Sequence, residues 1–341
     1  MRRANRQGRC LNGILLLDKP TGITSNAILQ HLKRLFNARK AGHTGALDPL
    51  ATGLLPICFG EATKFSQFLL DANKSYQALA YLGIRTNTSD ADGEVMETKP
   101  WQHITEAKIR AELIPLTGTI NQVPSIYSAL KYQGQPLYKL ARAGIKVPIR
   151  SRQVTVYKLK LLKFFGPEVS LEITCSKGTY VRSLVEDLGR ALGCGAHVKQ
   201  LRRLATGPYT TEQMHTLTAI EDIADQIGSI CGRHLEPQMQ QRMLFNGLDQ
   251  LLLPPDTAVS VLNAVQCTTH KVEALQQGKV ITLDLDHRPM EVGMVRVYGP
   301  GEIGADAAFI GLAELTQDGS LRAKRLMQTQ LAADLGKIIV G

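Results

Sequence analysis

The stretch GHTGALDPLATG, residues 42–53, places two titratable side chains, His43 and Asp48, in a run bracketed by glycines. Glycine lets the backbone approach a ligand closely, and loops often carry binding and catalytic groups. On its own the run proves little, because an Asp before a proline is more often a turn former than a catalyst, and a lone His is more often a structural residue. It does predict a structured loop over residues 41–60, which hold four glycines and two prolines in otherwise apolar sequence.

The segments on both sides of this run predict strands and helices in mixed order. A short buried strand at 13–17 is followed by a Pro- and Gly-containing loop and then by a helix that Ser25 caps, with apolar residues at helical spacing up to Phe36. Further strands are expected at 74–83, 154–162 and 169–176, the last with strict alternation of apolar and polar residues.

A second helix is expected after Gly178, with Thr179 as its cap and Gly193 at its end. This helix has Arg182 in its first turn. A cation at that end opposes the helix dipole. We therefore expect an anionic partner for Arg182, either a carboxylate or a phosphate.

The length of 341 residues allows about two domains. The best linker candidate is LLLPPD at 251–256. Beyond it, short strands at 280–285, 293–298 and 308–313 are separated by Gly- and Pro-containing turns, which indicates a small β-barrel-like domain.

The net charge of +10 is unevenly distributed. Residues 1–40 carry nine basic side chains and one acid, residues 130–163 carry nine and no acid, and residues 177–203 carry six and two acids, so the rest of the chain is net acidic. If the three segments converge in space, they form a face that binds a polyanion. The alternative is that each run is solvated surface.

The six cysteines are spread singly, with no CxxC pair and no nearby His at metal-ligand spacing. This pattern is typical of reduced thiols and predicts neither a disulfide framework nor a metal site. The apolar run at 14–17 is too short for a signal peptide or a membrane span. We expect a cytoplasmic protein with no membrane association.

The segment GHTGALDPLATGLLP at 42–56 resembles the signature of the TruB family of tRNA pseudouridine synthases. Four more blocks resemble that family in the family's order: LDKPTGITS at 17–25, GEATKFSQFLLDANKSYQALAYLG at 60–83, SKGTYVRSLVEDLG at 176–189 and HVKQLRRLATGPY at 197–209. More loosely, VRVYGPGEIG at 295–304 followed by FIGLAEL at 309–315 resembles a PUA-type RNA-binding domain.

The resemblance implies an α+β fold. Its catalytic domain, residues 1–250, would hold a mixed, largely antiparallel central sheet flanked by helices, with a basic RNA-gripping insertion at about 124–152. Residues 251–341 would form a PUA-like β domain.

The implied reaction is the isomerisation of uridine 55 in the T loop of tRNA, which breaks the bond from ribose C1′ to N1 and remakes it to C5. It involves no net redox change and no cofactor. Cleavage of a glycosidic bond develops positive charge on the sugar, so a carboxylate is needed to stabilise or trap it, and Asp48 is the candidate. Whether Asp48 attacks the sugar, attacks the ring, or takes a C2′ proton to form a glycal stays open.

The matched blocks imply further site residues. Arg182 would pair with the catalytic carboxylate, and Tyr76 would stack on the flipped base, although without the match it would be read as a strand-core aromatic. His43 would fill the space left by the extruded nucleotide. Substrate-binding positions also include Lys19, Lys64, Tyr180 and Leu201. Plain core packing remains an alternative for Leu201. The two lysines would contact phosphate or anchor a loop, and an exposed, solubilising role is the alternative for either of them.

The expected partner is the T stem-loop of tRNA, bound with the target base flipped out of its stack. The chain would act as a monomer without an obligate protein partner. A related archaeal and eukaryotic branch works on guide RNAs inside a multi-protein particle, but the absence of a long Lys-rich tail fits the stand-alone bacterial type better. The alternative function is a catalytically silent tRNA-binding or tRNA-folding protein.

Overall fold

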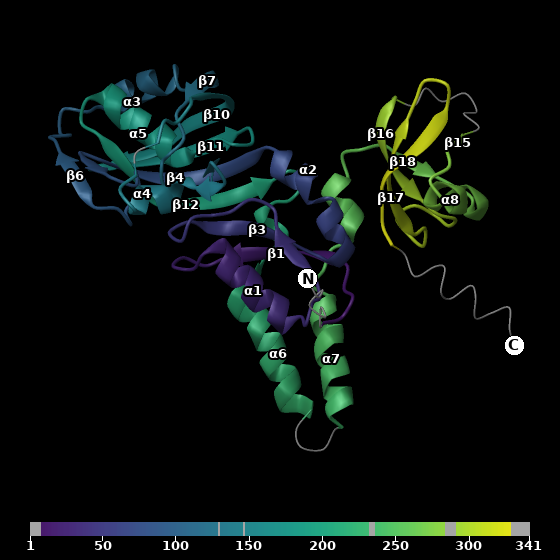
Figure 1. The fold of residues 1–341 in the computed structure, drawn as a ribbon. Helices are drawn as coiled ribbons and strands as arrows, with labels where there is room; N and C mark the ends of the chain where they lie inside the picture. The colour runs from purple at the N-terminus through teal and green to yellow at the C-terminus, as the bar shows by residue number, and fades with distance from the viewer. Residues whose placement is uncertain (1–7, 129, 146, 232–235, 284–290, 329–341) are drawn as a thin grey trace, which may run out of the picture.

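The computed structural model describes residues 8–128, 130–145, 147–231, 236–283 and 291–328 (Figure 1). Within these ranges a large mixed sheet forms one body, and a five-stranded sheet forms a smaller body beside it. The fold class is α+β, as expected. None of the helices in these ranges is both long and apolar enough to cross a bilayer.

The large sheet has the strand order β13-β1-β3-β12-β4-β11-β10-β7, with β2 added beside β3. Two of its pairings, β1 with β13 and β3 with β12, are parallel and the others are antiparallel. Its strands are β1 (Gly13–Lys19), β2 (Ala41–His43), β3 (Thr52–Phe59), β4 (Lys74–Leu82), β7 (Gly118–Gln122), β10 (Arg152–Phe165), β11 (Glu168–Cys175), β12 (Ala196–Thr206) and β13 (His215–Thr216). The mixed, largely antiparallel sheet expected for the catalytic body is confirmed.

Helices cover this sheet where its strands are most apolar. The apolar face of α5 (Val181–Leu192) packs on β12 and β4, and α3 (Glu106–Leu113) packs beside it against β10. At the other end lie α1 (Ser25–Leu35), the 3-10 helix η1 (Gly60–Lys64) and α2 (Ser66–Asp71). A hairpin of α6 (Leu217–Cys231) and α7 (Pro237–Asp249) extends away from the sheet (Figure 1).

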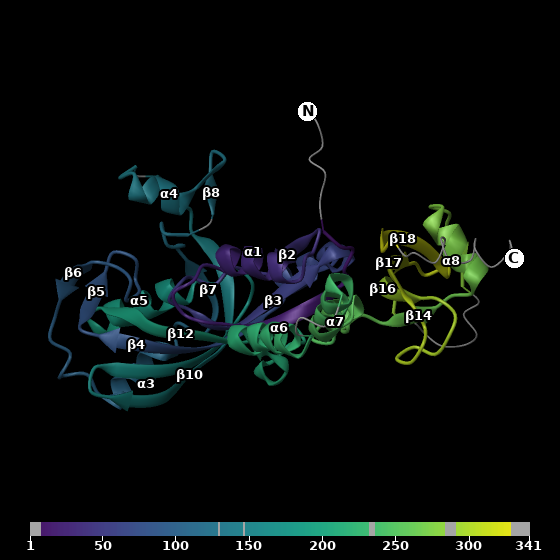
Figure 2. The ribbon, with the colours of Figure 1, turned by 90° about the horizontal axis from the view of Figure 1, so that it is seen from below.

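Two excursions leave the sheet. The first is the hairpin of β5 (Ile84–Thr86) and β6 (Val95–Thr98) between β4 and α3. The second leaves the end of β7 and returns at the start of β10, and it carries β8 (Lys131–Tyr132), β9 (Gln135–Pro136) and α4 (Leu137–Arg142). Figure 2 shows α4 and β8 standing clear of the sheet on the side where α1 lies.

The smaller body follows the 3-10 helix η4 (Pro255–Val259) and has the strand order β14-β16-β17-β18-β15. Its elements are β14 (Ala264–Gln266), α8 (Thr269–Gln276), β15 (Ile281–Thr282), β16 (Gly293–Tyr298), β17 (Phe309–Leu315) and β18 (Ser320–Leu326). An apolar cluster joins the two bodies, because Leu312 of β17 packs in one core with Phe65, Ile14 and Leu54.

Three local predictions are wrong. The expected loop at 41–60 contains β2 and the buried strand β3. Thr24 rather than Ser25 caps α1, since its hydroxyl accepts the Ala27 N–H. No side chain caps α5, whose first turn follows Tyr180, whereas Gly193 ends it in the left-handed conformation as expected, with φ 81°.

Candidate active site

A cavity of about 360 Å³ opens between the Asp48 loop and the start of α5. Segments far apart in sequence line it, and among them are five of the residues that the sequence singled out: Asp48, Tyr76, Tyr180, Arg182 and Leu201. Tyr76 and Leu201 come from the neighbouring strands β4 and β12, in the middle of the sheet. The fold therefore brings the predicted carboxylate, arginine and aromatic ring to one place.

Asp48 and Arg182 form an ion pair, with 3.1 Å between Oδ2 and Nε. The Asp48 side chain is 42% exposed toward the cavity, whereas Arg182 is only 6% exposed. The expectation that Arg182 has an anionic partner is confirmed, and the partner is a carboxylate.

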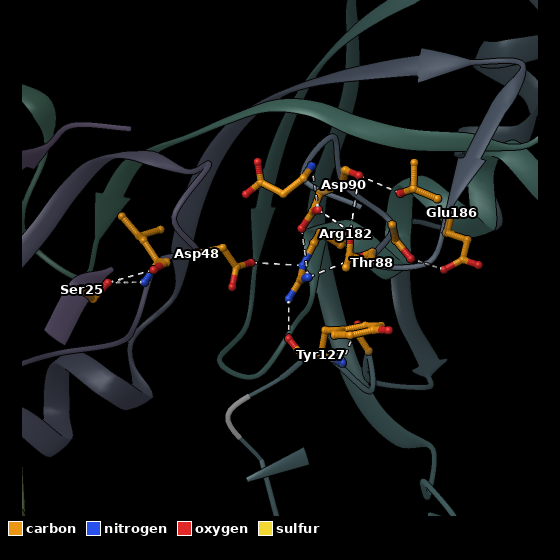
Figure 3. A network of polar contacts seen from close by, with 12 residues as sticks. Ser25, Asp48, Thr88, Asp90, Tyr127, Arg182 and Glu186 are labelled. Atoms are coloured by element: carbon orange, nitrogen blue, oxygen red, sulfur yellow. Dashed lines mark hydrogen bonds and ion pairs between the residues drawn. The ribbon is translucent and has the colours of Figure 1, made fainter. Parts of the chain in front are cut away.

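The guanidinium of Arg182 makes further hydrogen bonds besides its ion pair with Asp48 (Figure 3). Nη1 donates to Asp90 Oδ2 at 3.0 Å and to the Thr88 carbonyl at 3.1 Å, and Nη2 donates to the Tyr127 carbonyl at 3.1 Å. Asp90 is itself buried. Arg182 is thus shared between two carboxylates and held in a fixed orientation.

The pKa of Asp48 lies above its ordinary value. Burial is the largest cause, Arg182 and Lys19 oppose it, and the negative charges of Asp90 and Asp92 add to it. The attraction of Arg182 and Lys19 therefore does not fully offset the cost of burying the charge of Asp48.

The loop that carries Asp48 is fixed on both sides of it. Before Asp48, the Ser25 hydroxyl donates to the Leu47 carbonyl at 2.9 Å and accepts the Leu47 N–H at 2.7 Å. After it, the fully buried Lys19 ammonium donates to the carbonyls of Pro49 at 3.3 Å and Ala51 at 2.7 Å. Burial lowers the pKa of Lys19 to about 8. This geometry favours anchoring of the loop over a phosphate contact or an exposed, solubilising role for Lys19.

A second buried arginine, Arg203, lies beside Tyr76 and also lines the cavity. Arg203 is 1% exposed, pairs in register with Tyr76, and donates to the carbonyls of Leu54 at 2.6 Å and Gly45 at 3.2 Å. Burial raises the pKa of Tyr76, while Arg203 opposes that rise. Burial and Arg203 both lower the pKa of His43, which lies at the end of β2.

Comparison with known proteins identifies the family to which a chain with this site belongs. Residues 33–181 match the TruB family pseudouridylate synthase N-terminal domain, residues 182–260 match a tRNA pseudouridylate synthase B C-terminal domain, and residues 264–327 match the C-terminal domain of pseudouridine synthase II TruB. A tRNA pseudouridine synthase B of Vibrio atlanticus is 48% identical over 94% of this chain and 96% of its own. One of Aeromonas salmonicida is 49% identical over 96% and 97%.

The chain belongs to the TruB family.

Solved structures show the same TruB fold. A Cbf5-Nop10-Gar1 complex contains a chain that is 26% identical with a TM-score of 0.65, covering 93% of this chain and 84% of that one. An H/ACA RNP bound to a substrate RNA containing 2'-deoxyuridine contains a chain of the same fold, 24% identical with a TM-score of 0.67, covering 97% and 92%.

Three of the predicted residues of this TruB protein lie outside the cavity wall. Lys19 lies behind the Asp48 loop, and His43 lies on β2 with its buried Nδ1 free of hydrogen bonds to any residue described. Lys64 contacts the smaller body, since Nζ donates to the Leu326 carbonyl at 2.8 Å and pairs with Glu61 at 2.6 Å.

Sequence reasoning missed Asp90 and Arg203. Asp90 lies in the polar turn NTSDADGE at 87–94, which reads as an ordinary acidic turn until the fold brings it to Arg182. Arg203 lies in the matched block at 197–209. It is two residues from Leu201 on β12, so both side chains lie on one face of the strand, and this spacing was the one available signal that Arg203 points inward.

Proposed function

We propose that this chain is a tRNA pseudouridine synthase that isomerises uridine 55 in the T loop. Relatives about 48% identical over nearly their whole length carry the name tRNA pseudouridine synthase B. The observation that carries the proposal is the Asp48–Arg182 ion pair in a cavity that Tyr76 and Leu201 also line.

The chemistry assigns each of these groups a role. Asp48 stabilises or traps the ribose when the C1′–N1 bond breaks, attacks the ring, or takes a C2′ proton to form a glycal and later returns that proton. Arg182 keeps Asp48 ionised and aimed, and Tyr76 and Leu201 hold the flipped uracil between them while it turns to present C5. The C1′–C5 bond then forms, the C5 proton is lost, and N1 gains a proton, so that no group leaves. Tyr180 lines the cavity and contributes to substrate binding there, whereas Lys19 acts on binding only by anchoring the loop that carries Asp48. His43 and Lys64 would contact the RNA outside the cavity wall.

The chain's own organisation supports a tRNA substrate. We assign residues 1–250 to the catalytic domain, with a basic RNA-gripping insertion at about 124–152, and residues 251–341 to a PUA-like RNA-binding domain. Because Asp48, Tyr76 and Arg182 all come from one chain, we expect the chain to act as a monomer without an obligate protein partner. The free thiols of Cys10, Cys58, Cys175, Cys194 and Cys267 favour a cytoplasmic location.

The test is to incubate a T stem-loop RNA with the wild type, with Asp48→Asn and with the matched control Asp222→Asn, whose side chain lies on the exposed face of α6. Pseudouridine is mapped by chemical labelling. Product is expected from the wild type and the control alone, and only at the T-loop uridine. Tight binding by a wild type that makes no product would establish the silent tRNA-binding alternative, and product from Asp48→Asn would remove Asp48 from the reaction.

A further inference from the structure

The root of the insertion meets the start of the helix that carries Arg182. Gln122 ends β7 and Arg152 begins β10, and the two residues face each other in register. Both side chains reach the turn that leads into α5. Arg152 donates to the Gly178 carbonyl, and its guanidinium lies 4.9 Å from the centre of the Tyr180 ring.

Gln122 is fully buried and holds the Tyr180 backbone from both sides. The Tyr180 N–H donates to Oε1 at 2.7 Å, and Nε2 donates to the Tyr180 carbonyl at 3.0 Å. Only this orientation of the amide satisfies both groups, because the flipped amide would set donor against donor and acceptor against acceptor.

Tyr180 is the N-cap residue that directly precedes α5, and no side chain caps this helix. Its carbonyl also accepts the first helical hydrogen bond, from the Leu184 N–H at 3.1 Å. By fixing both polar groups of Tyr180, the Gln122 amide sets the direction in which the first turn of α5 leaves the sheet. Arg182 follows two residues later.

Two more contacts join the same turn to the insertion root. The Ser183 hydroxyl donates to the Val123 carbonyl at 3.1 Å, and Arg182 Nη2 donates to the Tyr127 carbonyl. Since Arg182 must satisfy Asp48, Asp90 and two carbonyls at once, a small rotation of the turn would break the pairing of Nε with Asp48.

We propose that Gln122 is a positioning residue of this site: its buried amide clamps Tyr180 so that Arg182 addresses Asp48, and it ties that geometry to the root of the insertion. The inference rests on the proposed function, because its consequence is the rate of pseudouridine formation. Gln122 does not line the cavity and acts through Arg182.

The test uses Gln122→Met, which keeps the length of the side chain and removes both hydrogen bonds. The matched control is Gln153→Met, the same change at an exposed position of β10 opposite Asn121. Single-turnover rates on a T stem-loop RNA are measured from pH 5 to 9, together with the Kd of the RNA and the far-ultraviolet circular dichroism of each variant.

The charges that face Asp48 are Arg182 on α5, Lys19 on β1, and Asp90 and Asp92 in the turn between β5 and β6. A displaced Arg182 no longer opposes the rise in the pKa of Asp48. In Gln122→Met we therefore expect a rate at least about tenfold lower and an acidic limb of the pH–rate profile moved to higher pH by about half a unit or more. Because Tyr180 also lines the cavity, the Kd is measured to separate weaker binding from this change in rate. The control keeps the wild-type profile.

A folded Gln122→Met with the wild-type limb would overturn the inference, even if its rate were low, because a merely structural role would leave the limb in place. If that variant does not fold, Gln122→Asn, whose amide is one methylene too short to reach Tyr180, has the same expected shift and the same refuting result. A wild type that forms no pseudouridine would remove the proposed function and the inference with it, whereas an active wild type with an unshifted variant would remove the inference alone.

Discussion

Asp90→Asn is the substitution whose effect on the site can be worked out most fully. Asp90 Oδ2 accepts from Arg182 at 3.0 Å, while Oδ1 accepts from the Thr88 hydroxyl at 2.5 Å and the Asp92 N–H at 3.2 Å. Every neighbour of this carboxylate is a donor. An asparagine must turn its NH2 group toward one side, so either Arg182 or the Thr88 and Asp92 donors face another donor.

The loss of one buried acceptor costs about 1–3 kcal/mol in the free energy of unfolding. This cost is smaller than the roughly 3–5 kcal/mol that is lost when a buried ion pair is broken completely, because Asp48 still neutralises Arg182. The catalytic effect has a definite sign. Since the charge of Asp90 raises the pKa of Asp48, its removal lowers that pKa, and the acidic limb of the rate profile moves to lower pH. Arg182 then pairs with Asp48 alone, which weakens the carboxylate as a nucleophile or a base in the proposed reaction.

The assay is the single-turnover rate of pseudouridine formation against pH, with urea unfolding of the same samples. We expect a rate about tenfold lower at neutral pH, which corresponds to about 1.4 kcal/mol. Asp92→Asn is the control, because Asp92 is exposed and adds to the pKa of Asp48 without touching Arg182: the limb should move slightly in the same direction with no loss of stability. An Asp90→Asn limb that stays or moves to higher pH would refute the electrostatic reasoning.

Other outcomes follow from the same geometry. Lys19→Met should lower the free energy of unfolding by about 1–3 kcal/mol near neutral pH in urea titrations, because two carbonyls beside Asp48 lose their donor. The folded-state pKa of Lys19 is about 8 against 10.5, so between these pH values the unfolded chain binds more protons and stability rises with pH; the slope over this window should be smaller in Lys19→Met. Gly53→Ala should destabilise the fold by more than about 2 kcal/mol in the same titrations, since φ is +96° and a Cβ would lie 2.3 Å from the Arg203 carbonyl oxygen. Affinity for the T stem-loop should fall several-fold between roughly 50 and 200 mM salt in filter binding, and a flat dependence would contradict the basic-surface prediction.

The strands that the sequence predicted well are those with a local signal. Alternation over 169–176 corresponds to β11, and the apolar run at 13–17 corresponds to β1, although β1 continues to Lys19 because the Lys19 side chain finds buried carbonyl partners. Strand β3 was missed because it is buried along nearly its whole length and contains Pro56, so it shows neither alternation nor ordinary strand composition.

Of the site, the helix dipole predicted that Arg182 needs an anion, and the fold supplies Asp48 and Asp90. The local sequence pattern did not predict which residues would contact one another across the site. Gln122 and Tyr180 are 58 residues apart, and Arg182 and Asp90 are 92 apart, so only the assembled sheet reveals that they touch.

In the proposed reaction, the sharing of Arg182 between two carboxylates would keep Asp48 both ionised and reactive. With Asp48 alone, a buried arginine would form a closed pair whose charge is cancelled, and the carboxylate would lose the electron density that it must offer to the ribose or the ring. Asp90 takes part of the guanidinium's donor capacity and leaves the two carboxylates and one cation with a net negative charge. Uridine is neutral and tolerates that charge, whereas the phosphates of the RNA need cations beside them. Arg152, from the acid-free run at 130–163, lines the same cavity and supplies one such cation where the insertion meets the site.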